Sequence, residues 1–231
     1  MAEDNKNCLN TLQSSNEGVA YRQIGEMNHQ FLGEVCYLIR NYEGDLPNLR
    51  EIFQPEAIDW ILKESVDQYY ISIIDFVIET GYKDEPEIDV DGKTILRRCT
   101  PIHNALENDI AFIIPELFQI YDRFDLNYAD EGGMTHFHLA CQFGCVDEVK
   151  KFLEAGQNPY CIAEKTGDSP LHFALANEHK NVAELLLRNG ADPNLADEDG
   201  WTPLHVICLM DRGAELLPID SSRSTKKLTR W

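Results

Sequence analysis

A chain of 231 residues is long enough for one large domain or two small ones. Its hydrophobic content of 43% and aromatic content of 10% exclude an intrinsically disordered protein. With 20 lysines and arginines against 40 aspartates and glutamates, the net charge is -20. This charge argues against nucleic acid and anionic membranes as direct partners, because binding to phosphates needs clustered cations. A partner protein with a basic surface fits it better.

The N-terminal residues and the cysteines predict a cytoplasmic or nuclear protein. The first residues, MAEDNKNCLN, are polar and acidic, whereas a secretory leader is basic and then apolar. The cysteines number seven and form no CxxC pair, which is typical of reduced intracellular thiols. The longest apolar stretch, ISIIDFVI, is too short to span a bilayer, so we expect no membrane association.

The N-terminal third is predicted to be helical. Polar residues 1–20 are expected to form a flexible N-terminus before a helical region at 21–65. An apolar period of about 3.5 residues predicts an amphipathic helix through Ile24, Phe31, Val35, Leu38 and Tyr42. This helix could dimerise as a coiled coil or cap the domain that follows, and it has too few heptads to favour a coiled coil. Pro55 starts another predicted helix, which runs through Leu62.

A short motif recurs along the rest of the chain, at RCTPIHNAL, GMTHFHLAC, GDSPLHFAL and GWTPLHVIC. Aligned on His103, His138, His172 and His205, the copies lie 35, 34 and 33 residues apart. Repetition at this period predicts a solenoid, in which each helix pair covers the apolar face of its neighbour.

The third copy, TGDSPLHFALANEHKNVAELLLRNGADPN, shows how one unit is expected to fold. Ser169 is placed to cap a first helix that Pro170 begins. A second, amphipathic helix carries Val182 and Leu186 and ends at Gly190, where a left-handed residue is expected. Each unit is therefore predicted to contain a turn, a short helix, a longer helix and a connecting loop.

These motifs resemble those of ankyrin-repeat proteins. The likeness rests on GWTPLH, GDSPLH and LLLRNGADPN, with diverged forms at GMTHFH and CTPIH, and it is strongest over 130–208. It implies an all-α solenoid of stacked helix-turn-helix units with projecting turns, preceded by an N-terminal helical cap. The array is expected at 66–212, with about three to four units and an incomplete last one, before a basic tail at 213–231.

A degenerate helix pair is expected ahead of the clearer repeats. IDWILKES and IDFVIET would be its helices, with a glycine stop at Gly81 and a turn at Gly92. The segment KTILRRC is an insertion that the usual repeat lacks, and so it predicts a longer turn there. The acidic run KDEPEIDVDG lacks the ligand spacing of a calcium loop and is interpreted as a solvated turn.

No catalytic or cofactor motif accompanies the repeats. The aligned histidines lie a full repeat apart and cannot converge on one metal; the resemblance implies that each hydrogen-bonds its turn and neighbouring backbone. A zinc site at His136 and His138 would require Cys141 and Cys145 to turn inward from their helix. Cys141 and Cys208 are expected in the core. We therefore expect no metal, no cofactor and no enzyme activity.

The expected activity is binding of another protein, as a scaffold, adaptor or inhibitor. The alternative is a substrate-recruiting subunit of an enzyme complex such as a ubiquitin ligase. The resemblance implies contacts from the turns and first helices on the concave face: Glu131, Met134, Gln142, Phe143, Lys165, Thr166, Asp168, Asn177, Glu198, Asp199, Trp201 and Met210. Trp201 either anchors the partner or covers the neighbouring turn. The oligomeric state does not follow from the sequence.

Overall fold

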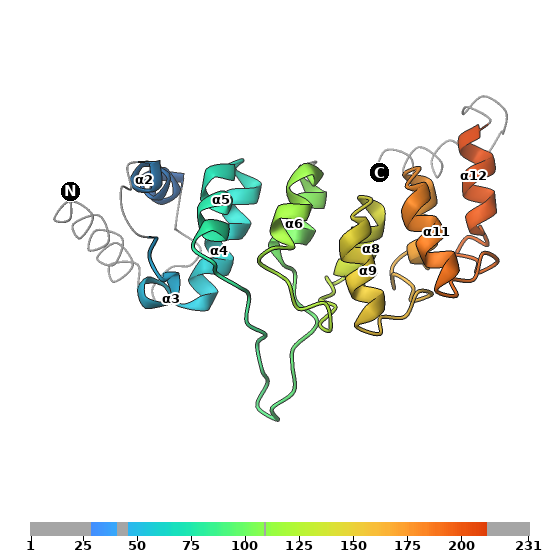
Figure 1. The fold of residues 1–231 in the computed structure, drawn as a ribbon, viewed down its shortest axis with the longest axis horizontal. Coiled ribbons are helices and arrows are strands. Elements are labelled where there is room, and N and C mark those ends of the chain that lie inside the picture. The colour runs from blue at the N-terminus through green and yellow to red at the C-terminus, as the bar shows by residue number, and fades with distance from the viewer. Residues whose placement is uncertain (1–28, 41–45, 109, 212–231) are drawn as a thin grey trace. The chain divides into compact units, whose positions relative to one another are not determined.

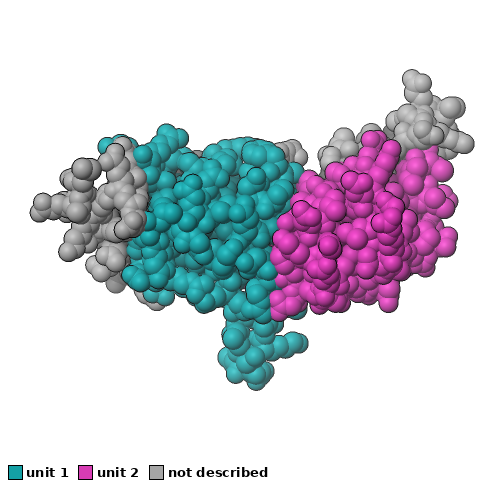
Figure 2. Space-filling view, in the orientation of Figure 1, with its two compact units in different colours: residues 1–123 teal, residues 124–231 magenta. Residues whose placement is uncertain are grey.

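A computed structural model describes residues 29–40, 46–108 and 110–211. The chain divides into two compact units, residues 1–123 and 124–231 (Figure 2). In the described ranges the regular elements are helices, and extended segments pair only at isolated bridges. The expected all-α repeat fold is confirmed. None of the helices described is long and apolar enough to cross a membrane.

The first unit is a stack of helices (Figure 1). In chain order they are α2 (His29–Arg40), α3 (Leu49–Ile52), α4 (Pro55–Asp67), α5 (Ile71–Glu79), α6 (Pro101–Glu107), the 3-10 turn η1 (Ala111–Ile113) and α7 (Ile114–Leu117). α4 packs on α5 and α6, and α5 packs on α7. The core of this unit therefore lies within the α4–α5 pair and between that pair and the helices that follow it.

α4 and α5 form the degenerate helix pair expected from the sequence. Ile58 and Leu62 of α4 are buried, as are Ile73 and Ile74 of α5. Burial of one such side chain stabilises the fold by roughly 1.5–3 kcal/mol. α2 packs on both helices and so lies against this pair, as the capping interpretation expects. The rest of the predicted N-terminal helix lies outside the described residues.

The connection between α5 and α6 projects far from the helices (Figure 1). It spans residues 80–100 and is longer than the corresponding connections at 155–169 and 189–202, which confirms the lengthened turn. Its two arms meet at an antiparallel bridge between Ile88 and Thr94. We call residues 83–98 the hairpin.

The second unit repeats one helix pair. Its helices are α8 (His136–Gln142), α9 (Val146–Glu154), α10 (Pro170–Ala176), α11 (Lys180–Arg188) and α12 (Pro203–Asp211). The first helices of successive repeats pack together, α8 on α10 and α10 on α12, while the second helices α9 and α11 pack on each other. The unit therefore has two helical layers.

The third motif copy folds as its sequence predicts. Ser169 is the N-cap of α10, and Pro170 takes its first position. Val182 and Leu186 of α11 are completely buried. Gly190 follows this helix with a φ of 92°, a left-handed conformation that glycine adopts without a steric penalty.

Cys208 corrects one expectation. Cys141 of α8 is completely buried, as expected, whereas the equivalent Cys208 of α12 is exposed. Leu204 and Ile207 of the same helix are exposed as well. The physical reason is that α12 packs on α10, and these three exposed side chains lie outside that contact. The predicted incomplete last repeat beyond it and the basic tail lie outside the described residues.

Candidate binding surface of the second unit

The first helix of each repeat begins with the same hydrogen-bonded cap. In α8, the Nδ1 atom of His138 accepts from the backbone N–H of Thr135 over 3.2 Å and lies 2.9 Å from its hydroxyl oxygen. Between His172 and Ser169 of α10 the distances are 3.1 and 2.8 Å. The same cap recurs in α6 and α12. The prediction that the aligned histidines are structural is confirmed.

The other ring nitrogen joins one repeat to the next. Because Nδ1 accepts from an N–H, the ring proton lies on Nε2. The Nε2 atom of His172 donates to the carbonyl of Trp201 over 3.0 Å. The Nε2 atom of His138 lies 3.4 Å from the carbonyl of Cys161. Each histidine therefore ties its own helix start to the backbone of the following turn.

Loss of hydration sets the protonation of buried His138 and half-buried Cys161. It lowers the pKa of His138 to about 4, against the opposing effects of the Cys161 carbonyl and Asp130. Burial also raises the pKa of the Cys161 thiol to about 12. Both groups are therefore neutral at pH 7, and neither is poised for acid–base or nucleophilic chemistry.

Three turns lead into the first helices, and we call residues 130–134, 163–168 and 197–201 the first, second and third turns. Asp130 closes the first turn, because its carboxylate accepts two backbone N–H groups, each over 2.8 Å. Asp197 closes the third in the same way, at 2.9 and 2.8 Å. The second turn has Ala163 in this place, and a backbone bond of 2.9 Å from its N–H to the carbonyl of Asp168 closes it. Each turn is thus held by hydrogen bonds within itself, from an aspartate carboxylate in the first and third turns and from the backbone in the second.

Successive turns touch backbone to backbone. The second turn donates an N–H to the first over 3.0 Å, from Lys165 to Gly132, and the third donates to the second over 3.3 Å. Gly133 and Gly167 have φ values of 73° and 71°. A Cβ atom at these glycines would lie 2.8 and 2.7 Å from a backbone nitrogen of the following turn. Only glycine therefore permits this close approach.

Asp130 and Asp197 were not among the site residues predicted from the sequence. Each lies three residues before a left-handed glycine, in DEGG and DEDG, and Asp89 lies likewise in DVDG. The recurring spacing D-x-x-G is the signal that would have identified them.

Most of the predicted contact residues lie at the surface of these turns and helix ends. Exposed are Glu131, Lys165, Glu198 and Asp199; partly exposed are Met134, Phe143, Thr166, Asn177 and Trp201. Phe143 and Asn177 end α8 and α10 as their C-caps. The surface therefore combines acidic tips with larger side chains between them.

Two predicted contacts are buried. Gln142 is 2% exposed and Asp168 is 4% exposed. Gln142 is the last residue of α8, which lies in the layer of first helices. Asp168 closes the second turn through its backbone carbonyl. Neither side chain faces solvent. Neither residue therefore belongs to the exposed surface of the turns and helix ends. Met210 lies in α12, where its side chain is not among those described.

The Trp201 side chain contacts its own repeat and is also partly exposed to solvent. Its ring meets the ring of His205 edge to face, with centroids 5.8 Å apart, and the residue stays partly exposed. The bond from His172 reaches the Trp201 carbonyl and not its ring. The indole is therefore supported from within its own repeat while part of it faces outward.

We expect His172→Ala to lower the free energy of unfolding by roughly 1–3 kcal/mol, because a buried cap and the bond to the next turn are both lost. His205→Ala is the matched control, since His205 caps α12 in the same way but is exposed. Urea unfolding measures both. Equal losses for the two variants would show that the bond to the following turn contributes nothing.

Known proteins share this repeat. Residues 148–218 match the family model of ankyrin repeats, in three copies. The chain is 40% identical over 113 residues to human BCL-6 corepressor-like protein 1, covering 49% of this chain and 6% of that protein. It is 35% identical over 95 residues to the mouse B-cell lymphoma 3 protein homolog, covering 41% and 20%. An ankyrin repeat-containing protein of Schizosaccharomyces pombe is 32% identical over 89 residues, covering 38% and 42%. The chain thus spans less than half the length of each of these relatives.

Proposed function

Because the chain is an ankyrin-repeat protein, and this fold is a non-catalytic protein-interaction fold, we propose that its second unit is a binding module for a protein with a basic surface. The contacts come from the exposed tips of the three turns and from the neighbouring ends of α8 and α10. In this function the chain acts as an adaptor, scaffold or inhibitor that holds its partner without changing it chemically.

The charge of the turns supports a basic partner. Glu131 in the first turn and Glu198 and Asp199 in the third are exposed acids, while Lys165 is the exposed base of the second turn. The chain as a whole carries a net charge of -20. Such a field steers a basic surface toward the turns and repels an acidic one.

The observation that carries the proposal is the rigid spacing of the turns. Each turn is closed by its own hydrogen bonds and is bonded through its backbone to the next. Their side chains are consequently presented in a fixed row before any partner arrives, which reduces the entropy lost on binding. Partly exposed Met134 and Trp201 stand in the same row and can fill apolar pockets of a partner.

The test begins with recovery of partners by affinity purification and mass spectrometry, followed by association kinetics with each purified partner. We expect the association rate constant to fall about tenfold or more between low and physiological salt, because exposed charges steer the encounter. Glu198→Gln combined with Asp199→Asn should lower the rate at low salt and flatten its dependence on salt.

Glu184→Gln provides the matched control for those variants. Glu184 is exposed, but it lies on α11 in the layer of second helices, away from the turn row. An association rate that does not change with salt, or one that Glu184→Gln lowers as much as the turn variants do, would contradict the proposed surface.

A further inference from the structure

The tip of the hairpin in the first unit is closed by hydrogen bonds of its own. Two backbone hydrogen bonds of 2.9 Å join its arms, from Asp89 N–H to the Lys93 carbonyl and from Ile95 N–H to the Glu87 carbonyl. The Asp89 carboxylate also accepts from the N–H groups of Asp91 and Lys93, at 2.9 and 2.8 Å. The tip is therefore a closed turn with a defined conformation.

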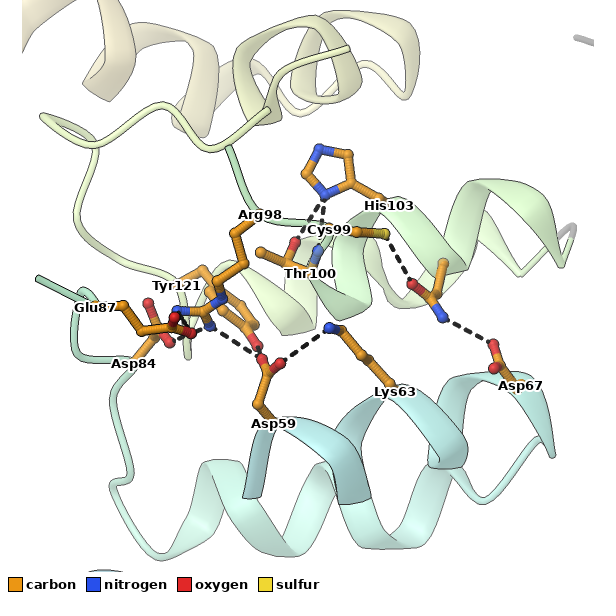
Figure 3. Close-up of polar contacts among 11 residues, drawn as sticks. Asp59, Lys63, Asp67, Asp84, Glu87, Arg98, Cys99, Thr100, His103 and Tyr121 are labelled. Atoms are coloured by element: carbon orange, nitrogen blue, oxygen red, sulfur yellow. Dashed lines mark hydrogen bonds and ion pairs between the residues drawn. The ribbon is translucent and has the colours of Figure 1, made fainter. Parts of the chain in front are cut away.

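The base of the hairpin is fixed by a largely buried group of charges (Figure 3). The Nη2 atom of Arg98 lies 2.7 Å from Asp84 in the opposite arm and 3.0 Å from Asp59 of α4. The Tyr121 hydroxyl donates to the same Asp59 oxygen over 2.9 Å. Although burial lowers it, the pKa of Arg98 is raised overall by the charges of Asp59 and Asp84, so the guanidinium stays charged.

The first arm has further attachments at its start. The Asp84 N–H donates to the Ile120 carbonyl over 2.9 Å. The Lys83 ammonium lies 3.2 Å from the Asp122 carboxylate. With Arg98 in the second arm, both arms are held where they leave the unit. A projecting element that is fixed in advance loses little entropy when a partner binds it.

The side chains at the tip are apolar and face solvent. Val90 is fully exposed, Ile88 is 63% exposed and Leu96 is 41% exposed. Glu87, Asp89 and Asp91 are exposed beside them, as is the base Lys93. Large apolar side chains that contribute nothing to a core, placed on a fixed projection, are typical of interface anchors.

We propose that the hairpin is a second docking element, whose apolar tip enters a pocket on a partner protein that is lined by apolar side chains and rimmed by lysine or arginine. The exposed acids around the tip complement such a rim. A second copy of this chain fits less well, because Glu87, Asp89 and Asp91 outnumber Lys93 at each tip and two such tips would repel each other. This contact uses the first unit and is independent of the turn row of the second.

The test uses the full chain with Val90 replaced by the photocrosslinker p-benzoylphenylalanine. Proteins crosslinked in cell extract are identified, purified and titrated against the unmodified chain. We expect Ile88→Thr combined with Val90→Thr to weaken binding about tenfold, through lost apolar burial. Both side chains are exposed, so thermal unfolding of this variant should match that of the natural sequence.

Ile162→Thr is the control, because Ile162 is an apolar residue of the second unit that is also exposed, by 51%. A captured protein whose affinity falls with the hairpin variant, and not with Ile162→Thr or the third-turn variants, supports the proposal. Crosslinking only to a second copy of the chain would overturn it, as would a captured protein indifferent to the hairpin variant. Absence of any crosslink would also overturn the proposal. The acids around the tip would then serve only to prevent the hairpin from pairing with strands of other chains.

Discussion

Arg98→Ala will lower the free energy of unfolding of the first unit by about 3 kcal/mol. The substitution removes the guanidinium that Asp84 and Asp59 share, and their side chains are 9% and 19% exposed. Asp59 keeps the Lys63 ammonium, 3.1 Å from its other carboxylate oxygen. Breaking a buried pair from one side costs more than the pair itself contributes, because the Asp84 carboxylate loses the guanidinium while it stays away from water. Denaturant unfolding, followed by a probe placed in the first unit, measures the loss.

Two variants separate this effect from a general loss of charge. Lys83→Ala removes an exposed ion pair at the same base and should cost only about 0–1 kcal/mol. Adding Asp59→Asn and Asp84→Asn to Arg98→Ala should restore part of the stability, because neutral amides carry a smaller desolvation penalty. If Arg98→Ala costs no more than Lys83→Ala, the buried charges do not hold the hairpin.

Acidification from pH 6.5 to pH 4 will destabilise the second unit by up to roughly 3 kcal/mol through His138 alone. Its pKa is about 4 in the folded protein against an ordinary value of 6.5. As the pH falls below 6.5, the unfolded chain binds the proton first, so stability is lost across this window and levels off below pH 4. Protonation of Nδ1 would also end its acceptance of the Thr135 N–H.

His138→Gln isolates this contribution, since glutamine at the same helix position can form the reciprocal cap without titrating. The difference in unfolding free energy between the two proteins should narrow or reverse as the pH falls from 6.5 to 4. Parallel curves for the two proteins across this range would show that His138 takes up its proton equally in the folded and unfolded states.

The helix pairs could be predicted from the sequence because their signals are local. Ser169, Pro170 and Gly190 mark helix ends through backbone chemistry within a few residues, and the repeat interval places the same signals in each copy. Cys208 shows the limit of such reasoning. Its burial depends on whether another helix covers α12, which its own motif does not encode.

The sites were harder to predict because they depend on distant partners. Arg98 and Asp59 are 39 residues apart, and no local pattern shows that they meet. The acidic run that contains Asp89 was interpreted as a solvated turn, and its charge alone gave no sign of the paired arms beneath it. In the turn row, Gln142 and Asp168 match the positions of contact residues, but packing within the first layer and turn closure bury them.

The hydrogen bonds between repeats determine which substitutions the protein can accept during evolution. Four of them end on main-chain atoms: the carbonyls of Cys161 and Trp201 receive the histidines, and the N–H groups of Lys165 and Glu198 join the turns. Substitution of the side chains at these four positions leaves every such atom in place. New partner preferences can therefore evolve at the turn tips without weakening the stack that supports them, provided that the glycines and histidines are retained.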